Sequence, residues 1–129
     1  MTTRDEVRNV LAGLVKAVAE KDAQAIVDCY EADAVVLTPN APMVRGSSAL
    51  RDMFQGMIDG GVKAIEFNTT DLIEDGSLVA EVGTSVIHVE LADGSSIADP
   101  GKYLVVYRRQ ADGEVKMVFD AFSGDSPPP

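Results

Sequence analysis

Apolar residues recur at two different periods along this chain, a helical period over the first half and a period of two over the second. The helical stripe within residues 7–18 predicts an amphipathic helix near the N-terminus. Thr3 and Glu6 have capping-box spacing just before this stripe, so we expect the helix to begin there. The stripe consists of Val7, Val10, Leu11, Leu14, Val15 and Val18.

Two shorter helices are predicted before the midpoint. Asp22 is placed to cap the first, which carries Ile26, Val27 and Tyr30 on its apolar positions. Residues 34–38 form a β-prone run that Pro39 ends, and residues 39–46 have the composition of a loop. The next helix begins at Ser47 or Ser48 and ends at Gly60-Gly61. Its apolar positions are Leu50, Met53, Phe54, Met57 and Ile58.

Alternation with a period of two predicts strands from residue 62 onward. Helices followed by antiparallel strands indicate an α+β domain whose helices cover one face of a strongly twisted sheet. We expect a single domain over residues 1–123 and a flexible proline-rich tail over residues 124–129. The predicted strands are residues 62–74, 78–91, 101–109 and 114–122, with turns at Asp75-Gly76, at 92–96 and at Asp112-Gly113.

Composition narrows the classes of function. The 129 residues include 46% hydrophobic and 25% charged residues, and the net charge of −10 disfavours both nucleic acid and anionic membrane surfaces as partners. The N-terminus lacks the apolar block of a signal peptide, and the one cysteine fits a reducing, cytoplasmic location. One histidine and one cysteine exclude the usual zinc ligand sets, and no calcium-loop spacing occurs, so we expect no metal. A small-molecule enzyme and a binding module both remain.

The last predicted hairpin gives the best candidate for chemistry. If Asp112-Gly113 is a two-residue turn, Tyr103, Val105 and Tyr107 share one face with Phe122, Asp120 and Val118, which lie opposite them. An aspartate inside a strand is unfavourable, and burial would raise its pKa toward the range that a general acid or base needs. The alternative is that Asp120 lies at the mouth of the cavity or accepts backbone N–H bonds.

Other polar residues on the strands have two interpretations each. His88 shares its face with Val82, so both reach a ligand if that face is concave; otherwise His88 is structural or lies at the rim. Glu81 and Lys102 fall on the opposite face and are expected to pair across strands on the outside, unless a bulge reverses them. Leu104 and Val106 would leave an apolar outer face, which predicts a homodimer.

The run from Tyr30 to Phe54, YEADAVVLTPNAPMVRGSSALRDMF, resembles the signature of the NTF2-like superfamily. The later segment GKYLVVYRRQADGEVKMVFDAFS is similar to its SnoaL-like/DUF4440 branch. The resemblance extends from about Val7 to Ser123 and implies the cone-shaped α+β fold of ketosteroid isomerase. It also implies pairing through the outer face of the sheet.

The resemblance argues against steroid isomerisation itself. The general-base aspartate of ketosteroid isomerase falls at Thr38, whose hydroxyl cannot act as a base at neutral pH. The two oxyanion-hole donors fall at Leu14 and near Val105, which are both apolar. A different pocket chemistry is therefore expected.

The family comparison at position 120 supports an inward Asp120. A supporting tyrosine is kept as Tyr30, another becomes Phe54, and Asp120 falls on the floor of the family's cavity. We expect a protein that binds a small molecule. If it is an enzyme, we expect a cofactor-free isomerase, cyclase, dehydratase or hydrolase in which Asp120 transfers the proton. The alternative is a non-catalytic ligand-binding or assembly module, favoured if side chains fill the cavity. The expected ligand contacts are Tyr30, Thr38, Phe54, Met57, Val82, His88, Tyr103, Val105, Tyr107 and Phe122.

Overall fold

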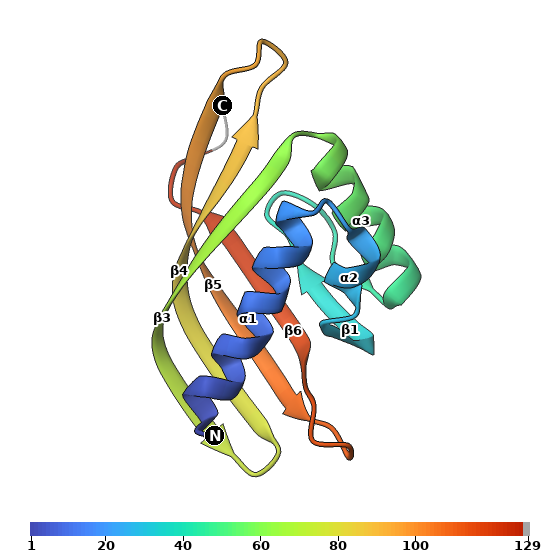
Figure 1. Cartoon of the computed structure of the whole chain (residues 1–129), viewed down its shortest axis with the longest axis vertical. Coiled ribbons are helices and arrows are strands. Elements are labelled where there is room, and N and C mark those ends of the chain that lie inside the picture. Colours follow the sequence, from blue (N-terminus) through green and yellow to red (C-terminus); the bar gives the residue numbers. More distant parts are fainter. Residues whose placement is uncertain (128–129) are drawn as a thin grey trace.

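The computed structural model describes residues 1–127, in which three helices lie on the inner face of one curved sheet (Figure 1). This is the predicted α+β cone. The helices are α1 (Thr3–Ala19), α2 (Ala23–Val27) and α3 (Ser47–Asp59). The strands are β1 (Tyr30–Leu37), β2 (Val44–Arg45), β3 (Val62–Asp75), β4 (Leu78–Glu90), β5 (Ser96–Arg109) and β6 (Val115–Gly124).

The six strands are ordered β2-β1-β6-β5-β4-β3. Only β1 and β6 run parallel among these neighbours; the other pairs are antiparallel. The long strands β3, β4 and β5 twist and bend around α1, which crosses the concave face (Figure 1). The apolar side of α1 is buried there, and each fully buried valine or leucine is worth about 1.5–3 kcal/mol. Of the expected stripe, Val15 is exposed and Val10 is only partly buried. The buried set is Val7, Leu11, Leu14, Ala17 and Val18.

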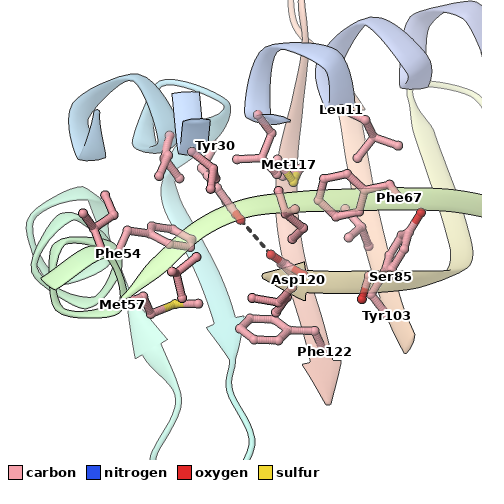
Figure 2. Close-up of a pocket in the computed structure, with 18 residues that line it drawn as sticks. Leu11, Tyr30, Phe54, Met57, Phe67, Ser85, Tyr103, Met117, Asp120 and Phe122 are labelled. Carbon is pink, nitrogen blue, oxygen red and sulfur yellow. Dashed lines mark hydrogen bonds between the residues drawn. The ribbon is translucent and has the colours of Figure 1, made fainter. Parts of the chain in front are cut away.

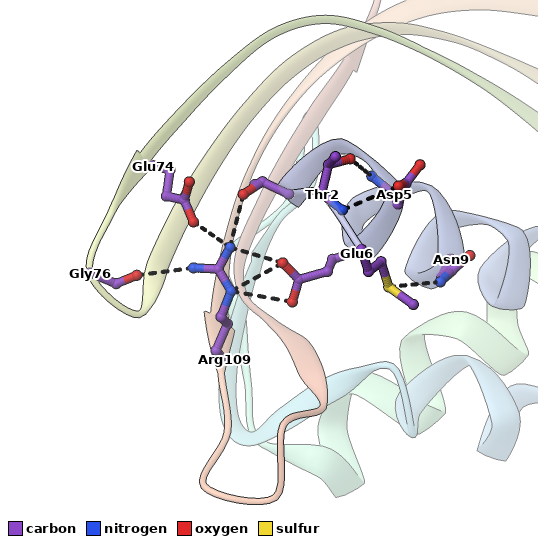
Figure 3. Close-up of polar contacts among 9 residues, drawn as sticks. Thr2, Asp5, Glu6, Asn9, Glu74, Gly76 and Arg109 are labelled. Carbon is purple, nitrogen blue, oxygen red and sulfur yellow. Dashed lines mark hydrogen bonds and ion pairs between the residues drawn. The ribbon is translucent and has the colours of Figure 1, made fainter.

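The start of α1 differs from the prediction by one residue. Thr2, not Thr3, caps the helix: its hydroxyl accepts from the Asp5 N–H over 3.1 Å, and the Asp5 carboxylate accepts from the Thr2 N–H. Thr3 and Glu6 instead accept hydrogen bonds from the Arg109 guanidinium, over 3.0 and 2.9 Å (Figure 3). The two side chains that the spacing suggested for the capping box are therefore bonded to Arg109 instead.

Arg109 also joins α1 to the turn between β3 and β4. Its guanidinium donates to the Gly76 carbonyl over 3.0 Å and to the Glu74 carboxylate (Figure 3). These contacts raise the pKa of Arg109, and the hydrogen bonds to Glu6 contribute most. The N-terminus of α1 is thereby held at one end of the sheet.

The two shorter helices also depart from prediction at one end each. Asp22 caps α2 as expected, accepting from the Ala25 N–H over 3.0 Å, but α2 ends before Tyr30, which begins β1. Gly46, with φ of +89°, precedes α3 and gives no side-chain cap. The Ser47 hydroxyl donates to the Ala32 carbonyl instead, over 3.4 Å. The loop predicted over residues 39–46 includes the short strand β2.

The strand ends are extended relative to the prediction. β5 begins at Ser96 rather than at 101, and β6 continues through Gly124, into the predicted tail. Residues 128 and 129 of that tail lie outside the described residues. Asp112-Gly113 lies in a longer connection that Gln110 and Glu114 close with a backbone hydrogen bond. A bulge then places Met117, not the predicted Val118, opposite Tyr107.

Candidate functional site

A cavity lies between the helices and the inner face of the sheet (Figure 2). Its free volume is about 60 Å³, well below the roughly 300–1,000 Å³ of sites that enclose drug-sized ligands. Its walls are mainly aliphatic and aromatic side chains from α1, α3 and the strands. The polar side chains among its lining residues are those of Tyr30, Ser85, Tyr103 and Asp120.

Asp120 provides the carboxyl group of this cavity. It lies on β6, where its register partners are Val36 of β1 and Val105 of β5, and it is 8% exposed. The Tyr30 hydroxyl donates to Asp120 Oδ2 over 2.7 Å (Figure 2). Tyr30 is positioned at the first residue of β1, with its ring 5.5 Å from the Phe54 ring. The parallel pairing of β1 with β6 therefore brings the tyrosine and the acid together.

Burial makes this carboxyl a group that titrates near neutrality. Desolvation raises the pKa of Asp120 to about 6, the Tyr30 hydrogen bond opposes that rise, and the charge of Glu81 adds to it. Burial and the Asp120 charge hold the pKa of Tyr30 well above its usual value. Tyr30 is thus a hydrogen-bond donor at physiological pH, while Asp120 can donate a proton below pH 6 and accept one above it.

A second buried carboxyl, Glu81, was predicted on the outer face, and this prediction is wrong. Glu81 is fully buried and accepts hydrogen bonds from the hydroxyls of Tyr103 over 2.7 Å, Tyr107 over 2.6 Å and Thr69 over 2.5 Å. Its expected partner Lys102 is exposed and lies 3.3 Å from Asp125 Oδ1. Burial and the Glu81 carboxylate raise the pKa values of both tyrosines, so these phenols remain protonated donors.

Gly83 allows Tyr103 to reach Glu81. A Cβ atom at position 83 would lie 2.4 Å from the Tyr103 hydroxyl and 2.5 Å from the Asn68 carbonyl oxygen. The tyrosine ring therefore crosses β4 where that strand has no side chain. A glycine inside a strand signals such a close approach, and Glu81 and Ser85 share its inward face. This glycine was the sequence signal that could have identified both residues.

The cavity brings together seven of the residues predicted to act on a ligand. They come from β1, α3, β5 and β6, and they converge on the space beside Asp120 (Figure 2). They are Tyr30, Phe54, Met57, Tyr103, Val105, Asp120 and Phe122.

Four predicted ligand contacts do not line this cavity. Tyr107 is buried behind its wall and bonded to Glu81. Thr38 and Val82 lie instead along a groove on the outer face of the sheet. His88 lies on the outer side of β4, with Nε2 2.6 Å from Glu66 Oε2. The β4 prediction failed because the face with Val82 and His88 is the outer one, while Glu81, Gly83 and Ser85 lie on the inner face beside Val79.

The described residues, 1–127, contain no group of three or more histidine, cysteine, aspartate or glutamate side chains arranged to hold a metal ion. No helix in the same range is long and apolar enough to cross a membrane.

The sequence model of the SnoaL-like domain matches residues 11–118. This chain belongs to the SnoaL-like family. Its predicted place in the NTF2-like superfamily is confirmed by this match and by solved structures with the same fold. No curated protein matches the sequence.

Solved structures similar to this SnoaL-like chain share its fold at low sequence identity. A ketosteroid isomerase-like protein from Erwinia carotovora atroseptica has a TM-score of 0.84 at 15% identity, over 95% of this chain and 96% of that one. An NTF2-like superfamily protein from Salmonella enterica has a TM-score of 0.80 at 11% identity, over 97% and 92%. A protein from Catenulispora acidiphila, solved in complex with S-DNPA, has a TM-score of 0.78 at 21% identity, over 95% and 92%.

Proposed function

We propose that this SnoaL-like domain binds a small, mostly apolar organic metabolite and transfers a proton on it without a cofactor. The reaction class is that of an isomerase, cyclase, dehydratase or hydrolase. The observation that carries this proposal is the Asp120–Tyr30 pair inside the apolar cavity. The complex of the Catenulispora acidiphila neighbour with S-DNPA supports small-molecule binding by this fold.

The two residues have separate roles in this proposal. Asp120 Oδ2 is occupied by the Tyr30 hydroxyl, while Oδ1 receives no hydrogen bond from the described residues. Oδ1 is therefore the oxygen that exchanges a proton with the ligand. Tyr30 holds the carboxyl in place and stabilises the carboxylate that accepts the proton. Proton abstraction then neutralises Asp120 and moves the negative charge onto the ligand.

The alternative is a non-catalytic ligand-binding or assembly module. The small free volume favours it, because Phe54, Met57 and Phe122 all contribute to filling the cone. A ligand as large as a steroid would require these side chains to move. The catalytic proposal therefore applies to small substrates, of about the size of one ring.

Reactions of two small carbonyl compounds test the proposal. We expect the protein to accelerate deuterium exchange into the methyl group of acetophenone, or hydrolysis of phenyl acetate, with a rate that rises through pH 6. Asp120→Asn should abolish the acceleration. Asp71→Asn, at an exposed position of β3, is the matched control and should retain it. A wild-type rate equal to that of buffer for both compounds would favour the non-catalytic alternative.

We further propose that the chain forms a homodimer through the outer face of the sheet. Val82, Leu104, Ala121 and Leu37 are successive register partners across β4, β5, β6 and β1, and three of them are more than 40% exposed. Phe119, at 50% exposure, extends this apolar row. Such a patch is large for the free surface of a monomer.

Light scattering at micromolar concentration should give the dimer mass for the wild type and the monomer mass for Leu104→Glu. A wild-type monomer would contradict the homodimer.

We also infer a cytoplasmic location from the single cysteine and the acidic composition. Cell fractionation would test it, and recovery outside the cytoplasm would overturn it.

A further inference from the structure

Ser85 is a polar residue of the cavity that the proposed proton transfer does not use. It lies on the inner face of β4 and is 9% exposed. Its register partners are Phe67 on β3 and Gly101 on β5. Gly101 has no side chain to cover the serine from β5, so the hydroxyl borders the cavity (Figure 2).

The hydroxyl of Ser85 differs from the other buried polar groups of the site in having no partner. Asp120 is bonded to Tyr30, and Glu81 to Tyr103, Tyr107 and Thr69, whereas no residue within 1–127 hydrogen-bonds to Ser85 Oγ. No fully buried side-chain oxygen in that range lacks a partner, so Ser85 Oγ keeps some accessible surface. Ser85 lines the cavity, so the hydroxyl is available to a ligand there. A ligand that hydrogen-bonds to this free hydroxyl gains about 0.5–1.5 kcal/mol.

We propose that Ser85 binds a second polar group of the ligand and so determines specificity. The ligand is then a small molecule with an apolar middle, a carbonyl group at Asp120 and Tyr30, and a hydroxyl or carbonyl group at Ser85. Asp120 lies on β6 and Ser85 on β4, with β5 between them. The apolar side chains of Phe67 and Phe122, which also line the cavity, match the apolar middle. This inference rests on the proposed function, because it takes the Asp120 end as the reacting end.

A matched pair of ketones tests this specificity. Acetophenone has one polar group, and 4-hydroxyacetophenone carries a second one at the far end of the same ring. We expect the wild type to bind 4-hydroxyacetophenone about fivefold more tightly, the ratio produced by one hydrogen bond of about 1 kcal/mol. Dissociation constants would come from NMR titration.

Substitutions separate this effect from a change in the fold. Ser85→Ala should remove the preference while leaving acetophenone binding intact, and Ser85→Thr should keep it. Thr84→Ala changes the neighbouring hydroxyl, on the exposed face of β4, and should also keep it. Because the readout is a ratio between two ligands, a general loss of stability does not mimic the expected result.

Each other outcome overturns a defined part of the account. Equal affinities in the wild type, or a preference that survives in Ser85→Ala, would overturn the role of Ser85 while leaving proton transfer by Asp120 intact. A preference without any deuterium exchange would overturn catalysis and leave Ser85 as a binding residue. If neither ketone binds up to its solubility limit, the proposed ligand class is wrong, and the role of Ser85 with it.

Discussion

Glu81 and Asp120 are both buried carboxyls, but their surroundings differ in the number of hydrogen-bond donors. They are the two register partners of Val105, one on each side, so a single row of the sheet contains both. Glu81 accepts from three hydroxyls, whereas Asp120 accepts from Tyr30 alone and borders the cavity. Both oxygens of Glu81 are engaged by other side chains, while Asp120 keeps one oxygen free to meet a ligand.

The two carboxyls also influence each other. Two strand spacings separate their backbones, a distance of roughly 10 Å. The negative charge of Glu81 disfavours a second charge on Asp120 and contributes to the raised pKa of that group. Glu81 thus raises the pKa of the cavity carboxyl without lining the cavity.

Removal of Glu81 should have the largest effect on stability. Glu81→Ala leaves the hydroxyls of Tyr103, Tyr107 and Thr69 unpaired in the interior, so we expect the free energy of unfolding to fall by about 4 kcal/mol. Urea denaturation measures this change. Glu66→Ala, at an exposed glutamate on β3, is the control and should change stability by about 0.5 kcal/mol or less. Similar losses in the two variants would show that the three-donor cluster is not special.

The second largest change in the free energy of unfolding is expected for Asp120→Asn, and it depends on pH. The folded state holds the Asp120 proton more tightly than the unfolded state, so the stability that this gives is complete below pH 3.8 and is lost as the pH rises through about 6. We expect wild-type stability relative to Asp120→Asn to fall by about 2–3 kcal/mol between pH 4 and pH 7.

Urea denaturation at a series of pH values measures this difference, and Asp71→Asn should follow the wild type. Parallel curves for wild type and Asp120→Asn would mean that Asp120 titrates alike in the folded and unfolded states.

A methyl group at position 83 should disturb the hydrogen bond between Tyr103 and Glu81. In Gly83→Ala the new Cβ would meet the Tyr103 hydroxyl and the Asn68 carbonyl, so either the tyrosine or the strand must shift. We expect a loss of about 2 kcal/mol. Gly56→Ala in α3, where the new methyl group meets nothing within 4 Å, should instead be neutral or stabilising. Equal behaviour of the two variants in thermal denaturation would contradict the proposed packing of Tyr103.

Tyr30→Phe should have the smallest effect on stability but a specific effect on Asp120. Loss of one hydrogen bond costs about 1 kcal/mol. Because the Tyr30 hydroxyl stabilises the charged carboxyl, its removal should move the pKa of Asp120 further upward. NMR titration of the variant would show the direction, and a downward shift would contradict the role assigned to Tyr30.

The β5–β6 hairpin shows why the inward position of Asp120 could be predicted. The connection after Arg109 is longer than the assumed two-residue turn, which moves the register of the nearest residues by one. The bulge between Val106 and Tyr107 restores the expected register, so Val105 pairs with Asp120 and Tyr103 with Phe122. Only the residue next to the bulge, Val118, was placed wrongly.

The β4 strand shows why the rest of the site could not be predicted. Hydrophobic alternation assigns the apolar face to the interior, but on β4 Val82 lies outside while Glu81 lies inside, beside Val79. That arrangement depends on hydroxyls from Tyr103, Tyr107 and Thr69, which come from two other strands. Such compensation between distant residues leaves no periodic signal in the sequence, apart from Gly83.

The most direct test is a carboxyl NMR titration of Asp120 in the free protein, with Asp120→Asn used to assign its resonance. We predict an inflection near pH 6, and the Glu81→Gln variant should move it to lower pH because it removes a negative charge. An inflection at or below the ordinary value of 3.8 would contradict the account. Asp120 would then be a second structural carboxylate, with no difference in chemistry between the two ends of the row.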